Sequence, residues 1–434
     1  MIEISKNVNE FIDLIDTFET NNNPFQSKEF YTTFFEKYRR FKYLILKVYD
    51  NTNVLVGLVP LREMLCLPGL VYFNFIGYRK GNYLGYICRD DQEKLVHFEV
   101  RNYFENSKKA CIINYYDINN TNPLYQILLN DKSVNYMIEL YKCPLVSLDR
   151  DPENFFRSKI TNSKKRTEIR KFERKLGLVG KIKMIQICDE ASYEEYEKFL
   201  EQIYYIHKER FEKVYTPSHF SDIKYRYYYN NMIERMTKAN KAFISLLLID
   251  DVVISFIFCL SNQKILIDWI PAFDPAFTKY NLGTVHYKML FEYLCNKTKY
   301  EYFDFSKGES VYKLRWADRE TINYQFVIVY NPNIISSMFN IFNTTKFKFK
   351  AYLRDIGVLK KIKLRMGSFI KENTGDKIQK CNLIIEKINI DKVSTNFKMN
   401  YRRIRFCDIS HRKEILDALY EGKSIEIIHA DSKK

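Results

Sequence analysis

The sequence predicts an α+β protein made of two similar lobes, each a mixed, mostly antiparallel sheet flanked by helices, followed by a basic C-terminal appendage. Hydrophobic residues make up 46% of the 434 residues, so the chain can build two to three domains with their own cores. The order of expected elements is the same in both halves: strand, two helices, three strands, helix, strand, short helix, strand. This repeated order indicates an internal duplication, although the offset between matching elements drifts along the chain.

The N-terminal half, residues 1–150, is expected to form the first lobe. Alternating and amphipathic runs predict strands at 1–5, 42–49, 54–61, 70–76, 110–115 and 134–142, and helices at 8–20, 27–38, 91–106 and 122–130. Asn51-Thr52-Asn53 predicts a hairpin turn. The helix at 91–106 follows Arg89-Asp90-Asp91, and carboxylates at a helix N-terminus take the place that a phosphate would occupy. We therefore expect this lobe to lack a cofactor.

The second lobe is expected at residues 151–332. Its predicted strands are 181–187, 242–249, 252–261, 264–271, 301–305 and 323–330, and its predicted helices are 190–212, 218–238, 283–297 and 309–316. Ser218 is the candidate N-cap of the helix at 218–238. The apolar run 243–261 is interrupted by Asp250 and Asp251, which favours a hairpin over a membrane span.

The net charge of +16 is concentrated in two segments, 157–183 with net +9 and 346–366 with net +7. Local basic patches indicate local anionic partners, such as cofactor phosphates, an RNA backbone or a membrane surface. Segment 157–183 contains a single aromatic residue, Phe172, so base stacking is not supported. A solvated connector, a site for an anionic acceptor such as a sugar nucleotide, and a tRNA site remain open for it. Segment 337–370 is richer in aromatics and suits an anionic membrane surface.

Cysteine and histidine usage argues against disulfides and metals. The nine cysteines include no CxxC pair and the six histidines are dispersed, so we expect no metal site. The chain opens on Met1-Ile2-Glu3-Ile4, a strand-like run with no basic n-region. We expect a cytoplasmic protein, with a peripheral position at the inner membrane face as an option. Residues 333–434 repeat neither half and are expected to form a basic helical or α+β appendage.

Three stretches resemble the GNAT acyltransferase superfamily. They are VGLVPLRE (56–63) with FIGYRKGNYLGYI (75–87); IHKERF (206–211); and IDWIPAFDPAFTKYNLGTVHYKML (267–290) followed by FDFSKGESVYKLRW (303–316). Within the superfamily, the chain is most similar to two-lobed acetyltransferase-like proteins of bacterial cellulose and polysaccharide gene clusters, which are related to Fem-type peptidyltransferases. The resemblance spans about residues 24–332. It implies transfer of an acyl group, acetyl in the first instance, from acyl-CoA to an amine or hydroxyl, with a saccharide or cell-envelope component as a candidate acceptor.

The resemblance places the CoA pyrophosphate at the start of the helix at 283–297. The residues that match the superfamily's loop are Lys279, Tyr280, Asn281, Leu282, Gly283 and Thr284. Backbone N–H groups and the helix dipole favour an anion there, and Gly283 lets the backbone approach a phosphate closely. The loop has fewer glycines than is common in the family. By local pattern alone it also fits an ordinary helix start.

Candidate catalytic residues follow from the same segments. Asp268 lies in an apolar strand, where a carboxylate is either functional or ion-paired. Asp304, between two phenylalanines, is a second candidate base, with a pKa raised by its neighbours. Glu309 continues the family motif, in which relatives tend to have a second acid where this chain has Ser310. By position, Tyr312 matches the tyrosine that protonates the departing thiolate in many GNAT enzymes.

The acceptor is expected to meet the first helices of the second lobe. His207 and Arg210 lie three residues apart on one helix face, and His207 is a further candidate base. Trp269 and Lys313 are the other candidate substrate-binding residues. In the expected reaction the acceptor attacks the thioester directly and backbone N–H groups of 267–272 stabilise the oxyanion.

Two alternatives remain. A Fem-type transferase that uses aminoacyl-tRNA is favoured by the basic segment 157–183. A non-catalytic adaptor that binds membrane or RNA is favoured by the sparse loop glycines.

Overall fold

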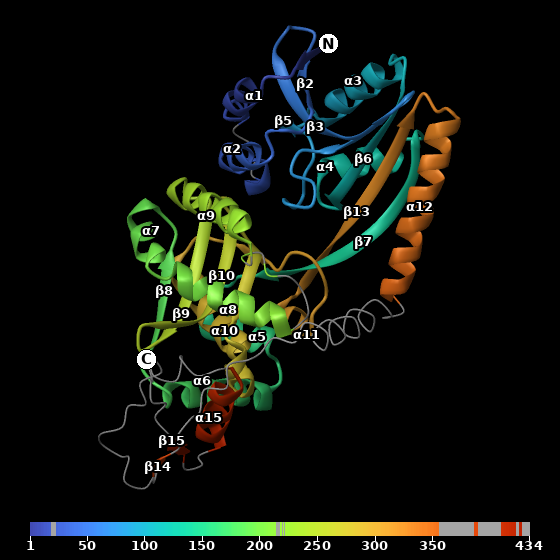
Figure 1. The fold of residues 1–434 in the computed structure, drawn as a ribbon. Helices are drawn as coiled ribbons and strands as arrows, with labels where there is room; N and C mark the ends of the chain where they lie inside the picture. Colours follow the sequence, from blue (N-terminus) through green and yellow to red (C-terminus); the bar gives the residue numbers. More distant parts are fainter. Residues whose placement is uncertain are drawn as a thin grey trace, which may run out of the picture.

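A computed structural model of the chain describes residues 1–18, 23–213, 218, 220, 222–355, 386–388, 409–421 and 425–427. Figure 1 shows two lobes, one built mainly from each half of the sequence, connected by long strands that run between them. Both lobes place helices against a mixed sheet, as the sequence predicts.

The N-terminal half folds in the predicted order. Its strands are β1 (Ile2–Ser5), β2 (Tyr43–Tyr49), β3 (Leu55–Leu67), β4 (Leu70–Phe75), β5 (Ile87–Cys88), β6 (Ala110–Asn119) and β7 (Val134–Ser147). Its helices are α1 (Val8–Ile15), the short 3-10 helix η1 (Pro24–Gln26), α2 (Lys28–Lys37), α3 (Glu93–Glu105) and α4 (Pro123–Asn130). The short strand β5 is not evident in the sequence pattern, because two residues are too few to show a period.

The C-terminal half repeats this order. Its strands are β8 (Ile182–Ile187), β9 (Ala242–Ile249), β10 (Val252–Ser261), β11 (Ile265–Phe273), β12 (Tyr302–Asp304) and β13 (Arg319–Tyr330). Its helices are α5 (Pro152–Lys159), α6 (Ser163–Gly177), α7 (Glu190–Glu197), α8 (Leu200–Lys213), α9 (Ile223–Lys238), the 3-10 helix η2 (Pro275–Tyr280), α10 (Leu282–Lys297) and α11 (Val311–Trp316).

Two helix predictions in this half are wrong in detail. The single helix expected at 190–212 is two, α7 and α8, with a turn at Lys198 and Phe199 between them. Ser218 does not cap α9. Asp222 does, by accepting the N–H of Lys224 at 2.7 Å, which satisfies one of the free donors of the first turn.

A single sheet runs through both lobes in the order β1-β2-β3-β4-β6-β13-β7-β12-β11-β10-β9-β8, with β5 paired to β3. The parallel pairs β4–β6 and β11–β12 occupy equivalent places in the two halves, and the other neighbours along this order are antiparallel. The halves therefore share strand order and direction. This confirms the predicted fold class of tandem lobes.

The two halves exchange their last strands. β13, from the C-terminal half, lies beside β6, with Tyr330 opposite Cys111. β7, from the N-terminal half, continues past β13 to pair with β12 through residues 145–147. Each half thus completes the sheet of the other. The predicted segments 1–150 and 151–332 follow the repeats along the chain, and their independence as folding units stays a prediction.

The C-terminal appendage is described in part: α12 (Ile334–Asp355), β14 (Glu386–Ile388), α15 (Ile409–Glu421) and β15 (Ile425–Ile427). α12 packs on β6 and β7, whereas α15 packs on η2. Of the basic segment expected at 337–370, residues 356–370 lie outside the described residues. Among the helices that the structure describes, none has the length and apolar character needed to cross a bilayer.

Candidate active site

The candidate site lies where two parallel strands separate. β11 pairs with β12 only through Ile265–Ile267 and Tyr302–Asp304. β11 then continues to Phe273 while β12 ends, and the next residue, Phe305, bonds through its N–H to the Pro144 carbonyl of β7. The backbone of β11 beyond Ile267 consequently has no ladder partner on the β12 side. Asp268 and Asp304 stand at the start of this gap.

Asp268 is a buried carboxyl group with one oxygen open to further interaction. It is 4% exposed, and its Oδ2 accepts a 2.6 Å hydrogen bond from the Tyr287 hydroxyl of α10. Its Oδ1 has no hydrogen-bond partner within the described part of the chain. Burial raises the pKa of Asp268 to about 6, against the opposing effects of Lys313 and Tyr287. A carboxylate with a pKa near the working pH and a free oxygen is suited to accept a proton.

Asp304 is the second buried carboxyl group, and the N-terminal half supplies one of its partners. It accepts a 2.6 Å hydrogen bond from the Tyr83 hydroxyl and a 2.7 Å bond from the Ser306 N–H. Asn82 donates to the Ser306 hydroxyl at 2.8 Å, so residues 82 and 83 each form a hydrogen bond with the segment 304–306. Burial raises the pKa of Asp304, although its hydrogen bonds oppose the shift.

Lys313 lies near both carboxyl groups and is itself buried. Its ammonium donates to the carbonyls of Phe305 and Lys307 at 2.7 and 2.8 Å, and the residue is 8% exposed. Desolvation lowers the pKa of Lys313, while Asp268 and Asp304 act to raise it. The lysine therefore offsets part of the negative charge of the pair.

Tyr312 and Arg210 belong to the same cluster. The Tyr312 ring stacks on Tyr287 with centroids 5.7 Å apart, and burial raises its pKa, so it keeps its proton at neutral pH. Arg210 on α8 lies over the Phe273 ring at 4.3 Å and acts electrostatically on Tyr312. A protonated tyrosine beside a cation is a reasonable donor to a departing anion.

Three predicted residues lie elsewhere. Glu309 is 45% exposed in its side chain and pairs with Lys142 at 3.7 Å. His207 is fully buried on α8, bonds to the Ser218 hydroxyl and stacks on Phe211. Trp269 packs against Phe25 and Phe258.

Strand alternation accounts for two of these positions. Asp268 and Trp269 are consecutive in β11, so their side chains point to opposite faces of the sheet. Asp268 meets α10, whereas Trp269 belongs to the core cluster that also contains Phe256, on which the His207 ring stacks. The geometry thus brings Asp268, Asp304, Tyr312, Lys313 and Arg210 together and separates Glu309, His207 and Trp269 from them.

The predicted donor loop divides into two parts. At the start of α10, Asn281 adopts a left-handed conformation, and the Thr284 hydroxyl donates to its side chain at 2.9 Å. The Thr284 hydroxyl also accepts from Arg315 of α11 at 2.7 Å, which brings a cation to the helix N-terminus. A Cβ at Gly283 would meet only the Phe273 ring, at 3.4 Å. Leu282 is buried in the core.

The preceding part of the loop is engaged by α15. The Tyr280 hydroxyl donates to the Leu416 carbonyl at 2.8 Å, and Lys279 pairs with Glu421 at 2.5 Å and Asp417 at 3.5 Å. The expected phosphate contacts of Lys279 and Tyr280 are therefore replaced by contacts to α15 in this structure. Gly283 and Arg315 remain suited to an anion, whereas Thr284 donates both its N–H and its hydroxyl to Asn281.

Buried charges fix α15 in this place. Arg412 is fully buried and pairs with Glu209 of α8 at 2.5 Å and with Asp274, just before η2, at 3.1 Å. Removing one partner of a buried pair leaves an uncompensated charge, so such a contact holds its elements firmly.

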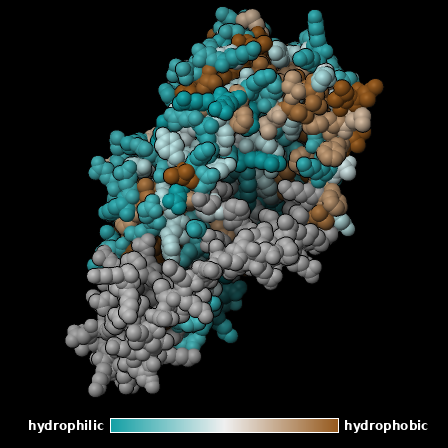
Figure 2. Space-filling model, in the orientation of Figure 1, coloured by the Kyte–Doolittle hydropathy of each residue, from teal (hydrophilic) through white to brown (hydrophobic). Residues whose placement is uncertain are grey.

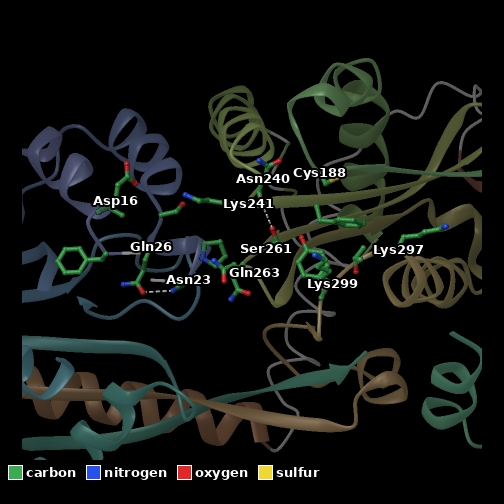
Figure 3. A pocket seen from close by; sticks show the side chains of 18 of the residues that line it. Asp16, Asn23, Gln26, Cys188, Asn240, Lys241, Ser261, Gln263, Lys297 and Lys299 are labelled. Carbon is green, nitrogen blue, oxygen red and sulfur yellow. Dashed lines mark hydrogen bonds between the residues drawn. The ribbon is translucent and has the colours of Figure 1, made fainter. Parts of the chain in front are cut away.

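Two neighbouring cavities lie between the lobes, and one of them reaches Asp304. One cavity of about 650 Å³ is lined by both halves; Figure 3 shows Asp16, Asn23 and Gln26 on one side and Lys241, Ser261 and Lys299 on the other. A second cavity of about 560 Å³ shares Asn23 and Gln26 with the first and includes Asp304 and Tyr83 in its lining. The 650 Å³ cavity therefore adjoins the cavity that contains Asp304, whereas Asp268 lines neither of the two.

The chain folds into two lobes that share one GNAT-like sheet. Residues 163–314 match the family model described as "Acetyltransferase (GNAT) domain". This match confirms the resemblance to the GNAT superfamily for the C-terminal half of the chain. No curated protein sequence matches the chain.

Solved structures of similar overall fold have low sequence identity. FemX aligns with a TM-score of 0.49 and 11% identity over 74% of this chain and 96% of its own. L-PGS from Bacillus licheniformis aligns with a TM-score of 0.44 and 12% identity over 74% and 91%. A tandem GNAT protein from the clavulanic acid biosynthesis pathway aligns with a TM-score of 0.39 and 8% identity over 77% and 100%.

Sequence reasoning missed three residues of the site. Tyr83 and Tyr287 bond to the carboxylates, and Arg315 reaches the start of α10. All three lie within the stretches that carry the family resemblance, but nothing in their own spacing marks them. Tyr83 in particular contacts a residue 221 positions away.

Proposed function

We propose that the chain transfers an acyl group, an acetyl group in the simplest case, from acyl-CoA to an amine or hydroxyl of an acceptor. The main support is the pair of buried carboxyl groups, Asp268 and Asp304, at the gap between β11 and β12, next to Lys313. An acceptor that brings its own nucleophile needs a base, an oxyanion site and an acid for the leaving group, and this cluster offers candidates for each. A saccharide or cell-envelope component is the acceptor class that we favour.

Each residue has a distinct role in this proposal. The acceptor nitrogen or oxygen attacks the thioester carbonyl, and Asp268 takes the acceptor proton on its open Oδ1. Unpaired N–H groups of β11 beyond Ile267 stabilise the oxyanion. When the carbon–sulfur bond breaks, Tyr312 donates its proton to the thiolate. Asp304 and Tyr83 position the segment that carries Lys313 and do not exchange protons.

The start of α10 supports acyl-CoA as the donor. Helix N-termini attract phosphates, and Arg315 adds a positive charge beside Gly283 and Thr284. No acidic residue occupies the first turn of α10. The equivalent helix of the other half, α3, follows Asp90 and Asp91 and carries Glu93 in its first turn, so the CoA is expected in the C-terminal half.

Calorimetric titration of acetyl-CoA into the full-length protein tests this proposal. Gly283→Val and Arg315→Gln should each lower affinity about ten- to a hundredfold, since a lost charge-assisted contact is worth about 1.5–3 kcal/mol. Gly283→Val is expected to fold, because the added Cβ makes ordinary contact with Phe273. Asp90→Asn, at the equivalent place in the other half, is the matched control and should leave affinity unchanged.

The chemistry can be separated from binding without knowing the acceptor. Slow release of CoA thiol to water, measured with a thiol reagent, should fall in Asp268→Asn while acetyl-CoA affinity is kept. Thiol release that is unchanged in Asp268→Asn would contradict the role of Asp268. If neither acetyl-CoA nor CoA binds, the acyl-CoA proposal is wrong, and a donor of another class or a non-catalytic adaptor replaces it.

A Fem-type reaction with aminoacyl-tRNA is the second candidate, and two observations favour it. α15 already holds Lys279 and Tyr280 of the donor loop. The basic helix α6 packs against η2 and α10 and exposes a row of cations: Lys164, Lys165, Arg170, Lys171 and Arg174. Binding of bulk tRNA that falls steeply with salt, together with no response to acetyl-CoA, would favour this candidate.

A further inference from the structure

Helix α12 presents its polar side to the protein and its apolar side to water. Ser336 is fully buried, and Asn340, Asn343 and Thr344 on the same side are only partly exposed. Two apolar residues, Phe339 and Phe347, also lie on this side and are only partly exposed; the Phe339 ring centroid is 5.5 Å from that of Tyr72 on β4. A helix that rests on a sheet normally places its apolar stripe inward. α12 does the reverse along most of its length.

The opposite side of α12 carries an exposed apolar stripe, here termed the outer face, which Thr345 and Lys346 interrupt between Phe342 and Phe349. Its residues are spaced by three, four or seven positions and so lie on one side of the helix. They are Ile334 (79% exposed), Met338 (68%), Ile341 (66%), Phe342 (67%), Phe349 (60%) and Tyr352 (61%). Figure 2 shows brown surface gathered at the right-hand edge of the molecule, where Figure 1 places α12.

Exposure of so many apolar side chains is unfavourable if the outer face contacts only water. Transfer of one such side chain to an apolar environment is worth about 1.5–3 kcal/mol, and contiguous apolar patches on a surface mark interaction sites. The sheet does not use these side chains, since α12 contacts β6 and β7 through its other side. The outer face is therefore available to a partner.

Charge indicates the class of partner. Lys346 and Lys348 are exposed on the same helix, within one turn of Phe342 and Phe349. The sequence from 346 to 366 carries net charge +7, with Asp355 as its one acid. Two copies of such a segment would repel each other if they met face to face. Apolar side chains bordered by lysines suit a bilayer with anionic headgroups, where the rings enter the acyl region and the ammonium groups meet phosphates.

We propose that the outer face of α12 docks the protein peripherally on an anionic membrane surface. This is independent of the acyl-transfer proposal, because it uses none of the residues around Asp268. Docking by α12 requires no spanning segment, in keeping with the finding that no described helix is long and apolar enough to cross a bilayer. It would hold the enzyme next to acceptors made or displayed at a membrane.

Vesicle flotation of the full-length protein tests the proposal. Wild type should float with phosphatidylcholine vesicles that contain phosphatidylglycerol, and less so at high salt. Replacing Phe342 and Phe349 with Ser should reduce partitioning by about tenfold per residue. Replacing Lys346 and Lys348 with Gln should reduce it by about fivefold per residue at low salt.

The matched control uses equally exposed apolar residues at another place. Ile223 (80% exposed) and Tyr227 (69%) lie on α9, and their replacement with Ser should leave flotation unchanged. Melting temperatures establish that every variant is folded. Flotation that is equal on neutral vesicles would refute an anionic surface. A wild-type dimer that becomes monomeric in the Phe342/Phe349 variant, without vesicle binding, would assign the face to a second copy. Absence of both vesicle binding and self-association would also overturn the proposal, because the face would then be covered by the chain itself.

Discussion

Replacing Asp268 with Asn should stabilise the folded protein at neutral pH. Burial raises the pKa of Asp268 from 3.8 to about 6. Between these two pKa values the carboxyl group is protonated in the native state and ionised in the unfolded state, so the free energy of unfolding falls as pH rises through this range. A shift of about two units corresponds to about 3 kcal/mol lost at neutral pH. The new amide keeps an acceptor for Tyr287 but adds an unpaired N–H, which costs about 1–3 kcal/mol, so a net gain of about 1 kcal/mol is expected.

The pH dependence is the sharper measurement, because the amide cost does not titrate. Urea unfolding can be followed through the only two tryptophans, Trp269 and Trp316, which lie in the same lobe as Asp268. Subtracting wild type from Asp268→Asn cancels every other titration. The difference in unfolding free energy should grow in favour of the variant by about 2 kcal/mol between about pH 4 and about pH 7.

Two further variants make this test specific. Asp90→Asn removes an exposed carboxylate and serves as the surface control. Tyr287→Phe removes a hydrogen bond that lowers the pKa of Asp268, so the wild-type window should extend to higher pH in that background. A difference between wild type and Asp268→Asn that stays constant with pH would refute a desolvated Asp268 and, with it, the base assigned to the reaction.

Two other predictions concern the assembly of the fold. Arg412→Met removes the cation that pairs with the buried carboxylates of Glu209 and Asp274, so the free energy of unfolding should fall by about 3–5 kcal/mol. Amide hydrogen exchange should become faster in α15. Unchanged exchange would show that these ion pairs do not hold the helix. Residues 1–150 expressed alone should aggregate, because β6 and β7 lose strand β13, which lies between them in the sheet. Co-expression with residues 151–434 should recover a soluble complex. A 1–150 fragment that is monomeric and melts cooperatively would contradict the strand exchange.

Most strands and helices could be predicted because local patterns determine them. Strands β9 and β10 match the expected ranges residue for residue, since Asp250 and Asp251 mark the turn between two apolar runs. The exchange of β7 and β13 could not be predicted. Both strands alternate and both follow a short helix, so either could close either lobe; partner choice depends on edges that only the assembled sheet presents.

The candidate site, like the fold, could be predicted where local sequence patterns determine it. Asp268 and Asp304 could be identified because burial of a carboxylate in an apolar strand costs free energy unless the group is paired or functional. Lys313 was expected to bind substrate, but its burial beside the two carboxyl groups could not be predicted, because the fold brings those groups to it. For His207 the sequence pattern was a poor guide to position. A histidine on an amphipathic helix is a candidate base, but the structure places His207 in an aromatic cluster on the other face of the sheet.

The strand exchange brings residues of the N-terminal half to the candidate site of the other half. β7 pairs along β12 up to Asp304, and it carries Cys143 and Leu145 to the wall of the gap. The loop that bears Tyr83 then bonds to that carboxylate from the same half. The first repeat therefore supplies both a neighbouring strand and a hydrogen-bond donor to Asp304. The N-terminal lobe is thus a structural component of the candidate site, and substitutions at Tyr83 should alter the environment of Asp304.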